Sequence, residues 1–534
     1  MLARMTHGPR RTMSEAFLGV DLGTSSVKAL VVAPDGTVRG TGSAEYPVLR
    51  PQPGWAEQDP DAWWEATSTA VQQAVGWSGT DVSIGGVGFS GQMHGAVFLG
   101  ENERVLSPAV IWADQRSSRQ ASHITASVGA ERLIEIAGSP LVTGFMAATA
   151  AWMREERASI WWRTKRLLSP KDEIRRRMTG AVATDPGDGS ASLLFDARWR
   201  NWSPDLLDAV EIPSILLPSV KPSSAVAGEI TQDVADELGL APGTVVVTGT
   251  GDAPSGLLGA GIVDPATMLL SLSTGAQVMV PDDAFHPDLA GRTHAFCSAL
   301  EPGPGRPGWY QMGATLVAGM AFRWLRDEML QLPAAGAYER MTSWAAKAPL
   351  GARGLLFLPY LVGERSPHMD PRARGAFLGL AAHHDHGDVV RAVMEGVTFA
   401  CRDAFAALQD AGANPERIVM AGGGSRSPFW RQMVADVFGL PVYALATTDQ
   451  AAMGAALLAA AGIHELDPVE TAQQWARYGP PTEPNVATHA RYEELYELFR
   501  DAYAPVIGVS HRLGDWFQAS VGPRIVPRPI RKRG

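Results

Sequence analysis

The sequence predicts an α/β protein made of two similar halves, and three observations support this prediction. Hydrophobic residues are 46% of the 534 residues and charged residues are 19%, which is an ordinary globular composition with ample material for large cores. Short apolar runs typical of strands alternate with segments of helical spacing. A strand–turn–strand pattern with a tip of small residues occurs once in each half.

Ordered structure in the first half is expected to begin at Phe17, after a disordered extension of residues 1–16. From there we expect three strands, a helix with Asp59 or Asp61 as its N-cap, and a further strand. In chain order these elements are predicted over residues 17–23, 27–36, 37–48, 59–76 and 83–91.

The second half repeats the strand–turn–strand pattern over residues 267–280. Its tip, Leu272-Ser273-Thr274-Gly275, is similar to the first tip, Leu22-Gly23-Thr24-Ser25. We interpret this repeat as an internal duplication of the fold, with the boundary between the halves near Val263.

A second unit of regular structure is predicted near the end of the chain. Residues 417–445 are typical of a strand, a glycine turn, a helix and a strand. Ser425 or Ser427 is expected near the start of this helix and Gly439 at its end. Residues 506–534 are predicted to form a basic, solvated tail.

Charge and cysteine content exclude several classes of protein. The net charge of −10 gives no electrostatic reason to bind nucleic acid or an anionic membrane. No run of about 18 apolar residues occurs, so no membrane span is expected. The only cysteines are Cys297 and Cys401, which excludes a disulfide scaffold and a cysteine-based zinc site. This cysteine content fits a reducing compartment, and we expect the protein to be cytoplasmic.

Two further clusters of polar residues are interpreted as structural. His383, His384 and His386 lie in a polar loop without the spacing of a metal site, and we expect them to be solvated. The basic run over residues 161–180 is predicted to be the exposed face of a helix pair, with its tryptophans packed inward.

The first hairpin tip has the composition of a phosphate site. Gly23 permits close approach of a ligand to the backbone, and the hydroxyls of Thr24 and Ser25, with nearby Lys28, suit phosphate oxygens. Asp21 has the wrong charge for phosphate but would anchor a Mg²⁺ ion placed between them. The alternative is a plain hairpin turn, because short motifs of this kind are often false positives.

The second tip and a later glycine run extend the same interpretation. Ser273, Thr274 and Gly275 would face the first tip, so that two hairpins clasp one polyphosphate. Residues 422–424, all glycine, would let a flat ring lie against the backbone, although close helix packing requires glycine equally well. No Walker A pattern and no dinucleotide fingerprint occurs, which disfavours an oxidoreductase.

Two strand ends carry candidate residues for a hydroxylated substrate. Asp252 follows an apolar strand and could face a bound hydroxyl group, or it could instead cap a helix. Met93 and His94 follow another strand, and His94 could donate to a sugar hydroxyl. The alternative for His94 is a structural role, which is common for a lone histidine.

Taken together, these motifs resemble those of the FGGY carbohydrate kinases, and among them those of the xylulokinases. The likeness extends from about Phe17 to about Ala504. The matching stretches are GVDLGTSSVKAL, GWAEQDPDAWW, GFSGQMHGA, the Trp112-x-Asp114-x-Arg116 segment, LLSPKDEIRRRMTG, LPYLVGERSPHMDPRARGAFLGL, AGGGSRSPFWRQMVAD and MGAALLAA.

The resemblance implies a fold and an activity. It implies two ribonuclease-H-like domains of the actin and hexokinase type around a central cleft. Residues 17–262 would bind the sugar and carry the first phosphate loop, and residues 263–505 would bind ATP. The expected reaction uses ATP and Mg²⁺ to phosphorylate a sugar hydroxyl, with conversion of D-xylulose to D-xylulose 5-phosphate as the first choice. It also implies a homodimer.

The resemblance also implies roles for individual residues. Asp252 would be the general base, with Asp21 as the second catalytic acid, and both would lie near the metal. The sugar-binding residues would be Gln92, Met93, His94, Asp114, Arg116 and Asp252. The ATP-binding residues would be Gly23, Thr24, Ser25, Lys28, Ser273, Thr274, Gly275, Gly313, Gly422, Gly423 and Gly424.

Four departures from the family pattern concern the identity of the sugar. Ala253 and Ala113 stand where asparagine is usual, Thr149 stands where lysine is expected, and the second loop reads Ser-Thr-Gly instead of Gly-Thr-Ser. Loss of one hydrogen bond to substrate can shift preference strongly. The alternatives are therefore a kinase for another ketose such as ribulose, a polyol or a sugar acid such as gluconate, or a sugar-independent ATPase of the same fold.

Overall fold

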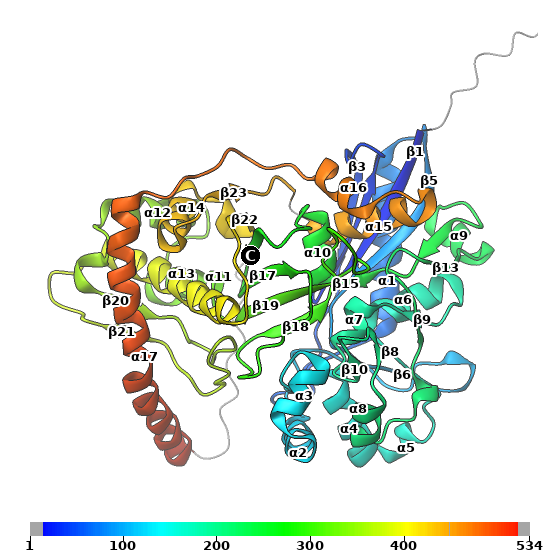
Figure 1. The fold of residues 1–534 in the computed structure, drawn as a ribbon, viewed down its shortest axis with the longest axis horizontal. Helices are drawn as coiled ribbons and strands as arrows, with labels where there is room; N and C mark the ends of the chain where they lie inside the picture. Colours follow the sequence, from blue (N-terminus) through cyan, green and yellow to red (C-terminus); the bar gives the residue numbers. More distant parts are fainter. Residues whose placement is uncertain (1–13, 448, 522–534) are drawn as a thin grey trace, which may run out of the picture.

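The computed structural model describes residues 14–447 and 449–521. This part of the chain forms two α/β halves side by side, each built on one large sheet (Figure 1). In the residues described, no helix combines the length and the apolar character needed to cross a membrane.

The sheet of the first half contains seven strands among the described residues, in the order β13-β14-β5-β1-β2-β3, with β15 also paired to β5. The β1–β2–β3 meander is antiparallel, whereas β5 runs parallel to β1, and β14 and β15 run parallel to β5. The strands are β1 (Ser14–Leu22), β2 (Ser26–Val32), β3 (Val38–Glu45), β5 (Val82–Gly91), β13 (Val226–Glu229), β14 (Val245–Val247) and β15 (Thr250–Gly251).

The sheet of the second half has six strands in the described residues, in the order β18-β19-β17-β16-β22-β23. They are β16 (Thr267–Leu272), β17 (Ala276–Asp282), β18 (His294–Cys297), β19 (Trp309–Thr315), β22 (Arg417–Ala421) and β23 (Val442–Ala444). The hairpin β16–β17 pairs with the parallel strand β22 as the hairpin β1–β2 pairs with β5. The predicted internal duplication and the two-domain α/β fold are therefore confirmed.

Helices cover both sheets and fill the space beside the first. In the first half they are α1 (Pro60–Ser78), α2 (Ser118–Val128), α3 (Ala130–Ala137), α4 (Met146–Glu156), α5 (Ala158–Trp161), α6 (Pro170–Thr179), α7 (Pro186–Ser190), α8 (Pro204–Val210), α9 (Gln232–Leu238) and α10 (Asp252–Gly259). In the second half they are α11 (Gly319–Trp324), α12 (Ala337–Lys347), α13 (His386–Asp410), α14 (Pro428–Phe438), α15 (Gln450–His464), α16 (Pro468–Trp475) and α17 (Val486–Val521).

Short strand pairs complete the structure. In the first half they are β4 (Glu57–Gln58) with β7 (Ala109–Val110), β6 (Val97–Leu99) with β8 (Arg166–Leu168), β9 (Ala183–Thr184) with β12 (Ser219–Val220), and β10 (Phe195–Asp196) with β11 (Asn201–Trp202). In the second half β20 (Leu356–Leu358) pairs with β21 (Ala376–Leu378).

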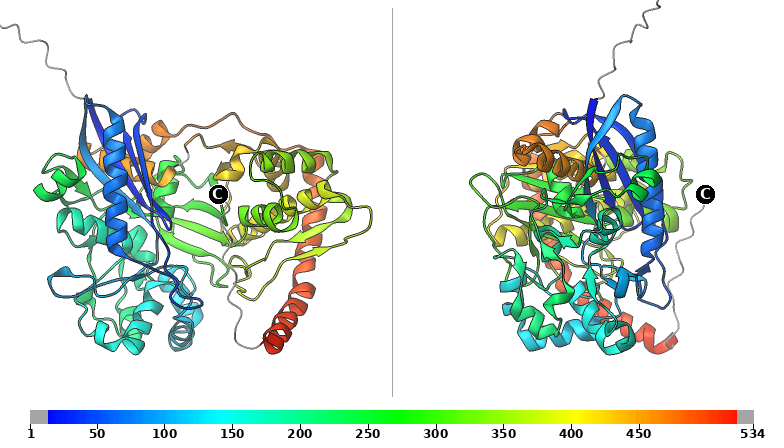
Figure 2. Two further views of the ribbon diagram at one scale, coloured as in Figure 1. Left: turned by 180° about the vertical axis from the view of Figure 1, so that it is seen from behind. Right: turned by 90° about the vertical axis from the view of Figure 1, so that its right-hand side faces the viewer.

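Helix α15 joins the two halves. It follows β23 of the second sheet, yet it packs on β1 and β5 of the first, on the face opposite α1 (Figures 1 and 2). Glycines make this contact possible, because a Cβ at Gly19 would lie 1.9 Å from the carbonyl oxygen of Ala452 and one at Gly88 would lie 1.9 Å from that of Ala455. The same helix crosses α10 backbone to backbone at Gly259 and Gly454.

Several local predictions are confirmed by the helix ends. Asp59 is the N-cap of α1, and its carboxylate accepts a hydrogen bond from the backbone of Asp61. Ser427 is the N-cap of α14, and Gly439 ends that helix in the left-handed conformation, with φ of 67°. Each residue type suits its position for the physical reason used in the prediction.

The predicted chain ends need correction. Strand β1 begins at Ser14, three residues before the predicted start, because Ser14 still pairs with Val82 of β5 across a register shift between Ala16 and Phe17. Residues 506–521 belong to helix α17 and are not a tail. Ile507 is buried in the hydrophobic core of the second half. The apolar spacing of helix α17 therefore continues past the predicted boundary at residue 505. The remainder of both predicted segments, residues 1–13 and 522–534, lies outside the described residues.

The prediction for the basic run over residues 161–180 is wrong in part. Trp161 packs inward, and Arg163 and Lys165 are exposed, as predicted, but the cations on α6 are not all solvated. The side chains of Lys171 and Arg175 are fully buried on α6, and Trp162 is 78% exposed. Lys171 Nζ lies 2.6 Å from Asp172 Oδ1, 3.1 Å from an Asp185 oxygen and within ion-pair distance of Asp188. Buried carboxylates therefore compensate the positive charges of Lys171 and Arg175. The number of charged residues in the sequence does not reveal this pairing.

Candidate active site

The predicted site residues of the first half converge on one edge of its sheet. Strands β1, β5 and β15 are in register, with Leu22 and Gly251 both opposite Gly91. Because these strands run parallel, their carboxyl ends meet at one edge. The first hairpin tip, the segment that begins at Gln92 and the residue Asp252 therefore lie together.

Asp252 is the first residue of α10, and the N-cap position belongs to Gly251. No side chain makes a capping hydrogen bond at this helix start, so the alternative role of Asp252 as a helix cap is wrong. Burial raises the pKa of Asp252 to about 7, and the negative charges of Asp21 and Asp188 act in the same direction. A carboxyl group poised near neutral pH at a strand end suits a general base.

Asp21 lies at the end of β1, on the other side of strand β5 from Asp252. Its Oδ1 accepts a hydrogen bond of 2.9 Å from Ser90 Oγ. Burial raises its pKa, while Ser90 and the charge of Lys28 act in the opposite direction. Two carboxylates that repel each other at one sheet edge fit a divalent cation, which would relieve the repulsion and which accepts one or two carboxylate ligands beside phosphate oxygens.

The first hairpin tip is held by side chains from outside the strands. The backbone oxygen of Thr24 accepts a hydrogen bond of 2.6 Å from Gln58 Nε2, and its hydroxyl accepts one of 2.9 Å from Trp112 Nε1. The Tyr46 hydroxyl donates to the backbone oxygen of Gly23. Ser25 is exposed at the tip. The loop is therefore held in place at Gly23 and Thr24 and is open to solvent at Ser25.

Lys28 makes an unexpected contact across the two halves. Its Nζ lies 2.5 Å from Oδ1 of Asp449, the residue that precedes α15. The lysine is therefore engaged with the second half in this structure, and its contact with a phosphate stays a prediction.

The second tip and the glycine turn lie next to each other. Ser273 and Thr274 are exposed at the end of the β16–β17 hairpin. A Cβ at Gly422, whose φ is 79°, would lie 2.3 Å from the backbone oxygen of Leu272, so glycine is required there. A Cβ at Gly423 would meet nothing within 4 Å. The glycine turn thus presents open backbone beside the second tip, as a bound ring would need.

His94 differs from the prediction in its hydrogen-bonding role. Its Nδ1 lies 2.8 Å from the carbonyl oxygen of Ala191, and its ring stacks on Phe145 with centroids 3.8 Å apart. Burial lowers its pKa to about 3, so the ring is neutral and Nδ1 carries the proton. The free Nε2 can therefore accept a hydrogen bond from a hydroxyl, in place of the predicted donation to one.

Two other predicted sugar-binding residues lie close to His94. Met93 packs beneath Gly251, where an added Cβ would lie 2.6 Å from Met93 Cγ, and its sulfur is 3.8 Å from the hydroxyl of Tyr310. Gln92 donates a hydrogen bond of 2.7 Å to Gln58, while its buried Oε1 has no partner in the described part of the chain. An unsatisfied buried acceptor at this sheet edge fits a site that takes a hydroxylated ligand.

Asp114 and Arg116 form an internal clamp. Asp114 is fully buried, and it accepts hydrogen bonds from the backbone of Ala56 and from the guanidinium of Arg116. Arg116 also pairs with Glu57 at 2.6 Å and lies over the ring of Trp55. These partners explain both residues structurally, so their contact with sugar stays a prediction.

Gly313 is buried in the middle of β19, where an added Cβ would lie 3.0 Å from that of Ala404 on α13. Close packing of the helix on the sheet explains this glycine. Its assignment to the ATP site also stays a prediction.

The sequence reasoning missed residues that the fold brings to the site. Trp112 holds the first hairpin tip, and His294, Phe296 and Tyr310 surround His94 and Met93 from the second half. Arg365 lies over the ring of Trp112, with Cζ 5.4 Å from the ring centroid. Trp112 and Arg365 could have been found from the sequence, because both lie inside the stretches that resemble the family. His294, Phe296 and Tyr310 could not, because strands β18 and β19 carry no motif of their own.

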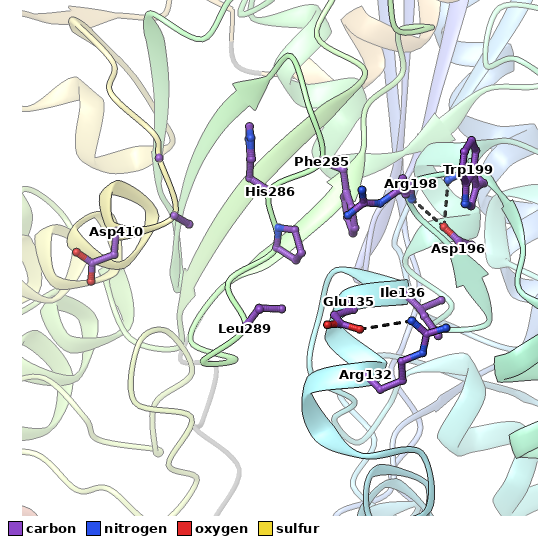
Figure 3. A pocket seen from close by; sticks show the side chains of 13 residues that line it. Arg132, Glu135, Ile136, Asp196, Arg198, Trp199, Phe285, His286, Leu289 and Asp410 are labelled. Atoms are coloured by element: carbon purple, nitrogen blue, oxygen red, sulfur yellow. Dashed lines mark hydrogen bonds and ion pairs between the residues drawn. The ribbon is translucent and has the colours of Figure 1, made fainter.

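A hollow of about 730 Å³ lies elsewhere on the boundary between the halves (Figure 3). It is lined by α3, the β10–β11 hairpin, the segment after β17 and the end of α13, and none of the predicted site residues lines it. The hollow therefore does not belong to the candidate active site.

Comparison with known proteins identifies the family of the chain. The N-terminal domain of the FGGY family of carbohydrate kinases matches residues 16–259, and its C-terminal domain matches residues 268–463. The xylulose kinase of Bacillus subtilis is 32% identical over 488 residues, which are 91% of this chain and 96% of that protein. The gluconokinase of the same bacterium is 28% identical over 454 residues, 84% of this chain and 87% of the relative.

A solved structure agrees with this comparison. The crystal structure of the xylulose kinase from Brucella ovis has a TM-score of 0.86 at 33% identity, and the match covers 92% of this chain and 100% of that one. The chain therefore belongs to the FGGY family of carbohydrate kinases and is similar to its xylulose kinases.

Proposed function

We propose that this protein transfers the γ-phosphoryl group of ATP to a hydroxyl of D-xylulose, giving D-xylulose 5-phosphate. The observation that carries the proposal is the position of Asp252. Its carboxyl group has a pKa of about 7 and lies at the sheet edge that also carries the first hairpin tip and the segment of Met93 and His94. The likeness to xylulose kinases supports this choice of sugar.

In this mechanism Asp252 accepts the proton of the attacking hydroxyl. Phosphoryl transfer depends mostly on positioning and charge stabilisation, so a carboxylate that is correctly placed suffices as base. His94 Nε2 accepts a hydrogen bond from another hydroxyl of the sugar. Met93 packs against Gly251, the residue before Asp252. The two hairpin tips supply backbone N–H groups and hydroxyls for the phosphates.

Mg²⁺ is expected near Asp21 and Asp252, where it would neutralise charge on the transferred group. Asp21 is held in place by Ser90, and its charge favours the cation over a bare phosphate. The role of residues 17–262 in sugar binding and of 263–505 in ATP binding is part of this proposal, as are a cytoplasmic location and a homodimer.

The test is a coupled assay of ADP release with the purified protein and a panel of acceptors. We expect D-xylulose to give the highest kcat/KM, Asp252→Ala to remove nearly all turnover, and ATP affinity in that variant to stay within several-fold. Full activity of Asp252→Ala, or rapid ATP hydrolysis that no sugar accelerates, would contradict the proposal.

A sugar acid is the second candidate for the acceptor. Ala253, next to the proposed base, has an apolar side chain and is 5% exposed, where the family usually has asparagine. The 28% identity with a gluconokinase is in line with this alternative. Turnover of gluconate at a higher kcat/KM than D-xylulose in the same panel would establish it.

A further inference from the structure

The side chain of Arg365 lacks, among the described residues, the polar partners that other buried arginines of the protein have. Its side chain makes no hydrogen bond and no ion pair with any residue in the part of the chain that the structure describes. Arg116 and Arg175, by contrast, are paired with aspartates at 2.7 Å. Arg365 is half-buried, and this burial lowers its pKa. A guanidinium carries five N–H donors in a fixed fork, so the partly desolvated Arg365 lacks the acceptors that its position requires.

The backbone around Arg365 is held firmly. Its own N–H donates to Glu364 Oε1 at 2.8 Å, and the N–H of Leu316 donates to the same oxygen at 2.7 Å. The N–H of Ser366 donates to the backbone oxygen of Ala314 in β19. Burial raises the pKa of Glu364 to about 8, while the charge of Arg365 acts in the opposite direction.

The side chain of Arg365 reaches the first half of the molecule. Its Cζ lies 5.4 Å from the ring centroid of Trp112, the residue that holds Thr24 of the first hairpin tip. Its positive charge also lowers the pKa of His94 and of His294, although burial is the larger cause in both. The guanidinium thus faces Trp112 from the second half, and its charge acts on the ring of His94.

The donors and acceptors around this position are complementary. His94 offers an acceptor at Nε2, and Arg365 offers only donors. A sugar hydroxyl is both a donor and an acceptor, so the hydroxyls of one sugar can satisfy both groups. An aliphatic segment of an acceptor would satisfy neither.

We propose that Arg365 is a sugar-binding residue that the second half contributes, donating hydrogen bonds to hydroxyl or carbonyl oxygens of the acceptor that are not phosphorylated. The acceptor class is a polyhydroxylated molecule that offers oxygens to both His94 and Arg365. This inference rests on the proposed function in taking the acceptor to be a sugar. It adds that specificity comes from both halves, since His94 belongs to the first and Arg365 to the second.

The test compares Arg365→Gln and Arg365→Lys with the control Arg372→Gln. Arg372 lies in the same loop but is exposed and pairs with Asp515 at 2.6 Å. The dissociation constant of D-xylulose is measured by calorimetry without nucleotide, and kinetic constants are measured for D-xylulose and ATP. Because charged hydrogen bonds are strong, we expect Arg365→Gln to weaken sugar binding by roughly tenfold to a hundredfold. The lysine variant should lose less, and KM for ATP should stay within about twofold.

A second readout separates binding from folding. Guanidinium ion at millimolar concentration should partly restore the sugar KM of Arg365→Gly and should leave Arg372→Gln unchanged. Unchanged sugar affinity in all Arg365 variants, or a rise in KM for ATP alone, would overturn the proposal. If the unaltered protein binds gluconate and not D-xylulose, the proposed acceptor fails, while the Arg365 variants measured with gluconate still decide the role of the arginine.

Discussion

Asp21 and Asp252 lie at the ends of strands on either side of β5, and the negative charge of Asp21 raises the pKa of Asp252. Burial alone disfavours the ionised form of Asp252, and its neighbour adds to this effect. The protein therefore keeps at its site a carboxylate that is less stable in the folded state than in water. Such an arrangement favours catalysis at the expense of stability.

We expect Asp252→Asn to abolish turnover and to stabilise the protein above neutral pH. Because the folded pKa is raised to about 7, the folded state binds this proton more tightly than the unfolded state. Stability of the unaltered protein is therefore lost between about pH 4 and pH 7 as the pH rises. At pH 8 the asparagine variant should gain on the order of 4 kcal/mol in the free energy of unfolding. Urea denaturation at pH 4 and pH 8 measures this difference.

The same experiment has an internal control. At pH 4 the side chain at position 252 is nearly uncharged in both folded proteins, so the two should have similar free energies of unfolding. An equal gain at both pH values would mean that charge at Asp252 has no part in the effect.

Asp21→Asn should lower the pKa of Asp252, since it removes a repelling charge while burial remains. The stability gained by the change Asp252→Asn should then be smaller, and should level off at a lower pH, with Asp21→Asn than with Asp21 in place. The exposed Asp35, which lies in the turn between β2 and β3, provides the control Asp35→Asn. Identical pH profiles with and without Asp21→Asn would show that Asp21 does not act on Asp252.

Sequence patterns predicted much of the fold because the signals were local. The cap at Asp59, the helix end at Gly439 and the two similar hairpins each depend on residues a few positions apart. The strand predicted over residues 83–91 was placed correctly, since β5 covers Val82–Gly91. The start of β1 was missed because Ser14 is fixed only by pairing with Val82, in a strand far along the chain.

The candidate site was predictable only where its residues lie in motifs. Asp252 follows a strand and a glycine, so its position could be read directly. The burial of Lys171 and the approach of Arg365 to Trp112 depend on contacts between distant segments. The tautomer of His94 depends on the carbonyl of Ala191, 97 residues further along the chain. No local pattern encodes such contacts.

We expect Lys171→Met to destabilise the protein strongly. The lysine is fully buried and lies within ion-pair distance of Asp172, Asp185 and Asp188. Removing its charge leaves these carboxylates with less compensation, which typically costs about 3 to 5 kcal/mol. The exposed Lys165 offers the matched variant Lys165→Met, which should stay within about 0.5 kcal/mol of the unaltered protein. Chemical denaturation checks both, and equal stability of the two variants would contradict this role of Lys171.

The crossing of α10 and α15 gives the last prediction. A Cβ at Gly259 would lie 1.9 Å from the backbone oxygen of Gln450, so Gly259→Ala forces the helices apart. Alanine normally stabilises a helix relative to glycine by about 1 kcal/mol. Here we expect a loss of about 1 to 3 kcal/mol, as for other overpacked positions.

Gly256→Ala in the same helix is the matched control. A Cβ there would lie 3.6 Å from Gln450 Cγ, an ordinary contact, so this variant should be neutral or slightly stabilising. Because α10 begins with Asp252, a shift of the helix at Gly259 should also move the proposed base and lower kcat. Thermal unfolding and steady-state kinetics of the two variants measure both effects. If the alanines prove equally stable and equally active, the helix crossing does not position Asp252.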